Sequence, residues 1–275
     1  MARRRRRSRG NAGDAWKLVG GIALVLVTFA VVAGWIVMRL DVADRPVLSE
    51  ETLCPTDGPR GITVVLLDAS DGLPEIAQQE VRGYLVGLSE ELEPYSLLEL
   101  RLLDPSVGGG RVVFSRCNPG DGSNLNELIG NPQLARRQWL EGFRQPLEDA
   151  LNGFLGPAPS DTSPIMGTVQ HVAIELFSNR QARELPKELV IVSDMLEHTS
   201  AYSQYPLDLS FERFKLTEAY RNFRTDLHGA DVTIKYVQRR TPTGLDPVKH
   251  LEFWLEWARD NNAGLFRADR LQGVG

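Results

Sequence analysis

Side chains with oxygen atoms follow two predicted strands and also occur in the loop region between these strands. Asp68 directly follows an apolar run, with Ser70 two residues later, and Asp194 follows a second apolar run. Ser163, with Thr162 beside it, lies in a polar loop between these runs. Carboxylates, hydroxyls and water are the ligands that hard divalent cations prefer. Asp68, Ser70, Ser163 and Asp194 therefore form a candidate Mg²⁺ site, at which Mn²⁺ or Ca²⁺ would be substitutes.

An alternation of strands and helices must position these side chains. The pattern predicts strands over residues 62–67, 97–103, 111–115, 189–192, 232–237 and 265–268. It predicts helices over residues 74–92, 134–155 (interrupted near Pro146), 165–177, 210–227 and 246–259. Such an order predicts an α/β fold with a doubly wound, mainly parallel sheet and helices on both faces. The single hairpin supplies one antiparallel edge strand. Ligands of such sheets bind beyond the carboxyl ends of the strands, where the two aspartates lie.

At these residues the sequence resembles the von Willebrand factor A (VWA) family. Its metal-ion-dependent adhesion site reads Asp-x-Ser-x-Ser after the first strand, with a Thr from a later loop and an Asp after the fourth strand. "DASDG" matches at Asp68 and Ser70, and "VIVSDM" matches at Asp194. "TSPIMG" resembles the loop motif, with Ser163 the better-aligned hydroxyl and Thr162 the reserve. The order of elements resembles the family from residue 62 to about residue 268.

Gly72 departs from the family pattern. The family usually has there a second Ser whose hydroxyl coordinates the metal, whereas glycine has no side chain. The adhesion site is thus degenerate, and metal binding is either weakened or lost while the fold is kept. Without a metal, Asp68 would cap the following helix or bind loop amides, and Ser163 would be an ordinary residue before proline at a helix start.

The resemblance implies a domain that binds a protein partner, with an acidic side chain of the partner completing the coordination of Mg²⁺. One alternative is a metal-independent structural scaffold in an envelope complex. Another is a Mg²⁺-dependent phosphohydrolase with Asp68 as the nucleophile. Such a phosphohydrolase needs a second carboxylate two residues after the nucleophile, where this sequence has Ser70. Neither a glycine-rich phosphate loop nor a nucleophile elbow occurs in the sequence. We therefore expect a binding protein rather than an enzyme.

Two further polar residues, Glu197 and His198, follow Asp194 closely in the sequence. Their place near the candidate site gives them two alternative roles, shaping the surface that meets a partner or serving as ordinary loop residues.

The amino-terminal part predicts a membrane anchor. Leu18 to Met38 is a run of 21 residues without a charge, preceded by the basic block Arg3–Arg7. Such a run covers a hydrocarbon core of roughly 30 Å, and basic residues stay in the cytoplasm. The expected domains are a basic cytoplasmic segment (1–17), a transmembrane helix (18–39), a linker (40–60) and a VWA-like extracytoplasmic domain (61–275). We expect a single-pass protein of the inner membrane. The alternative to an uncleaved anchor is a cleaved signal peptide.

The charge of the outer part argues against nucleic acid as a partner. The chain has 31 basic and 36 acidic residues, and its first 39 residues hold eight of the basic and one of the acidic ones. Residues 40–275 therefore keep 23 basic and 35 acidic residues, a net charge near −12. Nucleic-acid binding needs basic surface that displaces counterions.

The two cysteines, Cys54 and Cys117, are expected to form a disulfide bond in an oxidising compartment. Cys117 lies just past the strand that returns from the hairpin, so it lies at the amino end of the parallel strands. Cys54 precedes the first strand by eight residues, which span up to roughly 26 Å. Both cysteines therefore reach the same end of the sheet. Two free, separately buried thiols are the alternative.

The predicted topology is testable with a periplasm-active reporter fused after Gly275. We expect an active reporter, because the basic block holds the amino terminus in the cytoplasm. An inactive reporter, or a mature chain that begins after residue 40, would contradict the uncleaved anchor.

Overall fold

The structure is a computed structural model that describes residues 12–43, 46–68, 73–123, 125, 130–154, 160–238 and 244–271. The chain divides into two compact units, Met1–Pro46 and Val47–Gly275.

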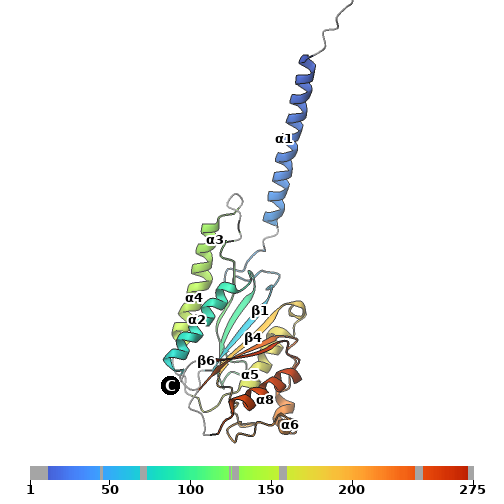
Figure 1. The fold of residues 1–275 in the computed structure, drawn as a ribbon. Helices are drawn as coiled ribbons and strands as arrows, with labels where there is room; N and C mark the ends of the chain where they lie inside the picture. The colour runs from blue at the N-terminus through green and yellow to red at the C-terminus, as the bar shows by residue number, and fades with distance from the viewer. Residues whose placement is uncertain are drawn as a thin grey trace, which may run out of the picture. The chain divides into compact units, whose positions relative to one another are not determined.

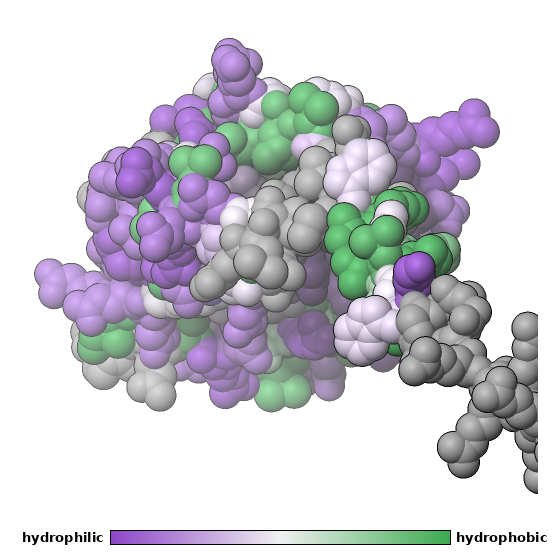
Figure 2. Space-filling model, turned by 90° about the horizontal axis from the view of Figure 1, so that it is seen from above, coloured by the Kyte–Doolittle hydropathy of each residue, from purple (hydrophilic) through white to green (hydrophobic). Residues whose placement is uncertain are grey.

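The first unit contains helix α1 (Ala12–Ala43). Its segment Val19–Ile36 has a mean hydropathy of 2.4, and none of it is buried against described protein residues. At 1.5 Å per residue these 18 residues rise about 27 Å. In Figure 2 the side chains of α1 are mostly green, whereas the visible face of the second unit is mostly purple. By length and composition, α1 is able to cross a membrane.

The second unit is built around one six-stranded sheet with the strand order β3-β2-β1-β4-β5-β6. Only the β2–β3 pair is antiparallel. This confirms the predicted mainly parallel sheet with one antiparallel edge strand. The strands are β1 (Ile62–Leu67), β2 (Leu97–Leu102), β3 (Arg111–Cys117), β4 (Lys187–Ser193), β5 (Asp231–Val237) and β6 (Phe266–Leu271).

Helices cover both faces of the sheet, as Figure 1 shows. One face carries α2 (Glu75–Glu91), α3 (Pro132–Trp139), a π-helical segment (Leu140–Arg144) and α4 (Gln145–Phe154). The other carries α5 (Ile165–Val172), a second π-helical segment (Ala173–Phe177), α6 (Phe211–Phe214), α7 (Glu218–Phe223) and α8 (Pro247–Asp260). All six residues of β1 are buried, because neighbouring strands and both helical layers enclose it.

Successive side chains of the central strands pack alternately against the two helical layers. Val64 and Leu66 of β1 pack with α5 and α8, whereas Val65 and Leu67 pack with α2 and α4. Successive residues of a strand point to opposite faces, so each central strand contributes to both cores. This alternation also decides which polar residues meet at the strand ends.

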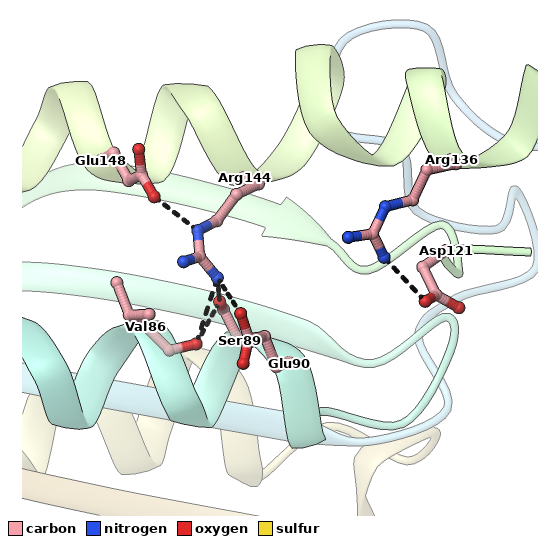
Figure 3. A network of polar contacts seen from close by, with 7 residues as sticks. All are labelled: Val86, Ser89, Glu90, Asp121, Arg136, Arg144 and Glu148. Carbon is pink, nitrogen blue, oxygen red and sulfur yellow. Dashed lines mark hydrogen bonds and ion pairs between the residues drawn. The ribbon is translucent and has the colours of Figure 1, made fainter. Parts of the chain in front are cut away.

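Arg144 joins α2 to the helices that lie beside it (Figure 3). Its Nε donates to Glu148 Oε1 at 2.6 Å. Its Nη1 donates to Ser89 Oγ at 3.1 Å and to Glu90 Oε1 at 3.0 Å, near the carboxyl end of α2. The guanidinium group therefore fixes this helical layer at the amino end of the parallel strands, away from the candidate site.

A disulfide bond joins Cys54 to Cys117, as predicted, with 4.7 Å between their Cα atoms. Beside it, Cys117 N donates to Thr52 O at 2.8 Å. An isolated antiparallel bridge between Leu48 and Pro55 folds this segment back on itself. Residues 47–56 are therefore fastened to the end of the sheet at which the parallel strands begin.

The single helix expected over residues 210–227 is wrong. The structure has two short helices there, α6 and α7, each with its own amino-terminal cap. Ser210 Oγ accepts from Arg213 N at 3.3 Å, and Thr217 Oγ1 accepts from Tyr220 N at 3.2 Å. A threonine that caps the amino terminus of a helix takes a non-helical backbone conformation, and this separates the two helices.

Removal of the disulfide is predicted to destabilise the second unit. The cysteines are 63 residues apart, and closing a loop of this length is worth about 4 kcal/mol on the chain-entropy model. The variant Cys54→Ser/Cys117→Ser should therefore melt well below the wild-type chain, and reductant should lower only the wild-type melting temperature. Equal melting temperatures for the variant and the oxidised wild-type protein would contradict the prediction.

Candidate functional site

Asp68 lies at the carboxyl end of β1, level with Ser193 on β4. The register pairs Leu67 with Val192, and Asp68 N donates to Val192 O at 2.9 Å. The Asp68 side chain is buried, and its Oδ2 accepts from Ser193 Oγ at 2.7 Å. Parallel pairing thus brings a carboxylate and a hydroxyl together from strands 125 residues apart in sequence.

Ser163 brings a second hydroxyl to the same carboxylate. Its Oγ donates to Asp68 Oδ2 at 3.1 Å, and the side chain is buried. The hydroxyl of the neighbouring Thr162 lies 3.4 Å from Ser160 Oγ within its own loop. Of the two adjacent hydroxyl residues, the structure therefore places Ser163 against Asp68.

Asp194 follows β4 directly and is also buried. Its Oδ1 accepts from Leu196 N at 3.0 Å, which closes a turn after the strand. Asp194 is thus adjacent in sequence to a partner of Asp68, and its own described hydrogen bond is local. The fourth predicted ligand, Ser70, and the family departure at Gly72 lie outside the described residues.

Sequence reasoning missed Ser193 as a member of the site. The signal was present in the alternation: Leu189 and Ile191 share the face of α5, and Ser193 continues that series. Asp68 likewise continues the series of Leu66 on the neighbouring strand. Only the strand pairing shows that Ser193, rather than Asp194, is the residue of β4 that faces Asp68.

The assembled donors are all oxygen atoms of the kind that hard cations prefer. They comprise the Asp68 carboxylate and the hydroxyls of Ser163 and Ser193, with the Asp194 carboxylate next along the chain. Within the described ranges, no group of three or more His, Cys, Asp or Glu residues is placed to hold a metal ion. These oxygen donors are of the kind that hard cations such as Mg²⁺ prefer, and not of the kind that a soft-metal centre needs.

Glu197 lies entirely within the core behind this site, which rules out a direct surface contact with a partner. Its Oε2 accepts from Met166 N at 2.9 Å in the first turn of α5. Its Oε1 has no hydrogen-bond partner among the described residues. Burial is the main cause that raises the pKa of Glu197 to about 8; hydrogen bonds from the backbone of Met166 and Ile165 act against this rise, and the negative charge of Asp68 adds a smaller contribution to it. The carboxyl group is therefore mainly protonated at neutral pH.

His250 of α8 is a second buried titratable residue near Glu197. It lies between Tyr236 OH, at 3.1 Å, and Gln204 Oε1, at 3.2 Å. Gln204 Oε1 also accepts from Glu197 N at 3.0 Å, so the two titratable groups share one amide. Burial lowers the pKa of His250 to about 4, and the imidazole is therefore neutral at pH 7.

These two shifts predict opposite effects of pH on stability. The raised pKa of Glu197 means that the folded state keeps a proton the unfolded state loses, so stability falls as pH rises from about 4.5 to about 8. The slope approaches about 1.4 kcal/mol per pH unit. The lowered pKa of His250 makes stability fall as pH drops from about 6.5 to about 4.

The variant Glu197→Gln should remove the alkaline part of this dependence. The melting temperature of the variant should therefore exceed that of the wild type by a difference that grows from pH 5.5 to pH 7.5. Exposed Glu252 on α8 offers a control, because Glu252→Gln makes the same charge change at the surface. Parallel pH curves for wild type and Glu197→Gln would contradict the assignment.

Comparison with known proteins gives similarity in structure only. No model of a known protein family matches this chain, and no curated protein sequence matches it. One similar solved structure is an aerotolerance-related membrane protein from Bacteroides fragilis, carrying multiple mutations to serine, with 10% identity and a TM-score of 0.34. The match covers 76% of this chain and 91% of that chain.

Two other solved structures are similar to the same extent. A von Willebrand factor type A protein from Catenulispora acidiphila has 12% identity and a TM-score of 0.37, over 74% of this chain and 43% of that one. The manganese-loaded TRAP protein of Plasmodium vivax has 13% identity and a TM-score of 0.35, over 77% and 69%. At these values the similarities say nothing of ligands or partners. The mainly parallel sheet with a single antiparallel edge strand is the one that the family resemblance predicts.

Proposed function

We propose that this chain is a membrane-anchored binding protein. Its VWA-like domain would bind a protein partner through a Mg²⁺ ion at the carboxyl end of the sheet. The observation that carries this proposal is the buried Asp68 carboxylate, which accepts from Ser163 and Ser193, two hydroxyls brought from different elements. Asp194, and Ser70 beyond the described residues, would complete the protein ligands. An acidic side chain of the partner would take a remaining coordination position.

The proposed setting is the inner membrane, with α1 as a single-pass anchor. The basic residues before α1 would stay in the cytoplasm, and the second unit would face the periplasm or the exterior. The Cys54–Cys117 bond supports an oxidising compartment for this unit. Within the unit, the candidate site lies at the opposite end of the sheet from this bond, and therefore away from residues 47–56.

When bound, the cation would act as a Lewis acid that holds a carboxylate of the partner. The residues of this chain would hold the cation: Asp68 would supply negative charge, and the hydroxyls of Ser163 and Ser193 would fix the direction of the Asp68 carboxylate. Burial of Asp68 strengthens its electrostatic interactions, because the dielectric constant is low within the protein. This arrangement supports reversible binding without a catalytic step.

A metal-independent scaffold is the second candidate function. The presence of Gly72, where the family has a metal-binding hydroxyl, favours it. Such a domain would bind its partner through the same end of the sheet, with Asp68 serving only to join β1, β4 and the loop before α5.

Melting of the full chain in detergent micelles, with and without Mg²⁺, tests the cation. At a Mg²⁺ concentration ten times the dissociation constant, binding stabilises the folded state by about 1.4 kcal/mol. We expect the melting temperature of the second unit to rise by about 4 °C. Asp68→Asn should abolish the rise, and Asp121→Asn at the opposite end of the sheet should keep it. No shift at millimolar Mg²⁺ or Mn²⁺ would contradict a cation site.

Capture of the partner by the full chain then separates the two candidate functions. Capture that requires Mg²⁺ and is lost in Asp68→Asn supports adhesion through the cation. Capture that is equal with Mg²⁺ and with a chelator supports the metal-independent scaffold.

A further inference from the structure

Helix α5, which begins just after Ser163, has no local amino-terminal cap. Pro164 holds the cap position and makes no side-chain hydrogen bond to the first turn. The first N–H groups of a helix have no partner within the helix and need an acceptor from elsewhere. Glu197 supplies one over a distance of 31 residues in sequence, because its Oε2 accepts from Met166 N at 2.9 Å.

The segment that carries Glu197 is also joined to Ser163 itself. Ser163 N donates to His198 O at 2.8 Å, and His198 N donates to Ser163 O at 3.0 Å. Two backbone bonds and one side-chain bond therefore hold the start of α5 against residues 197–198. The Ser163 hydroxyl reaches Asp68 from this doubly held backbone, at 3.1 Å.

The position of Glu197 is fixed from the other side by Gln204. Glu197 N donates to Gln204 Oε1 at 3.0 Å, and Gln204 N donates to Glu197 O at 3.0 Å. The remaining carboxyl oxygen, Oε1, is buried without a partner among the described residues. Leaving such an atom unpaired costs about 1–3 kcal/mol. Stability alone does not account for a carboxyl group here, and local violations of this kind are typical of functional sites.

We propose that Glu197 is a positioning residue for the cation site. Its carboxyl group caps α5 and thereby holds the Ser163 hydroxyl in the orientation that meets a cation at Asp68. This inference rests on the proposed cation-binding function. Residues that orient metal ligands from behind typically change metal affinity by 10- to 100-fold when they are replaced.

Two substitutions at position 197 separate orientation from charge. Glu197→Gln keeps a carbonyl oxygen for Met166 N, whereas Glu197→Met fills a similar volume and removes the acceptor. Mn²⁺ affinity is measured by isothermal titration of the full chain in detergent micelles. We expect wild-type affinity for Glu197→Gln and roughly tenfold weaker affinity for Glu197→Met. Phe114→Leu, a core change in the edge strand, is the control for lost stability and should leave the affinity unchanged.

Met166→Pro provides a second route if Glu197→Met does not fold. It removes the N–H donor together with the buried Met166 side chain and leaves Glu197 in place, and proline is tolerated in the first turn of a helix. The same tenfold loss is expected. Wild-type affinity in a folded Glu197→Met or Met166→Pro variant would overturn the inference, as would an equal loss in Phe114→Leu.

Hydrogen exchange without metal keeps the inference separate from the proposed function. Amides of residues 163–168 should exchange faster in Glu197→Met than in Glu197→Gln, because only the former leaves α5 uncapped. If the wild-type chain binds neither Mn²⁺ nor Mg²⁺, the proposed function fails and this inference fails with it, whatever the exchange rates show. If the wild-type chain binds Mn²⁺ but neither affinity nor exchange differs between the two variants, the inference fails alone.

Discussion

Parallel pairing of β1 with β4 is the constraint on which the rest of the second unit depends. The two strands are adjacent in the sheet but separated by more than one hundred residues, and their register places Asp68 beside Ser193. The loop before α5 then crosses the same end of the sheet and adds Ser163. If this register moved by one residue, Ser193 would face the opposite helical layer, and the carboxylate would lose one of its two hydroxyl donors.

Asp68 and Glu197, two of the buried carboxyl groups near this end of the sheet, differ in how they are stabilised. Asp68 accepts from two hydroxyls, so its burial is compensated by hydrogen bonds. Glu197 accepts from Met166 N through Oε2, and burial shifts its equilibrium towards the neutral acid. Because Glu197 is mainly protonated at neutral pH, it adds no further buried negative charge to this end of the sheet.

The two ends of the sheet in the second unit therefore differ in their interactions. At the amino end of the parallel strands, the Cys54–Cys117 bond fastens residues 47–56, and Arg144 joins the neighbouring helices. At the carboxyl end, side chains from β1, β4 and the loop before α5 converge. The proposed binding site lies at the carboxyl end, which is where open parallel sheets commonly bind their ligands.

The amino-acid sequence by itself determined the strands, most helices, the antiparallel edge strand, the apolar span of α1 and the end of the sheet at which both cysteines lie. These features follow from local periodicity and chain direction, which depend only on residues close together in the sequence. The tertiary structure alone decided that Ser193 faces Asp68, that Ser163 rather than Thr162 does so, and that Glu197 is buried under α5. Those outcomes depend on the register between distant strands and on which loop covers which helix end, and both are set by packing across the whole domain. The break between α6 and α7 belongs to the same class, because threonine caps a helix only where packing favours a new start over continuation.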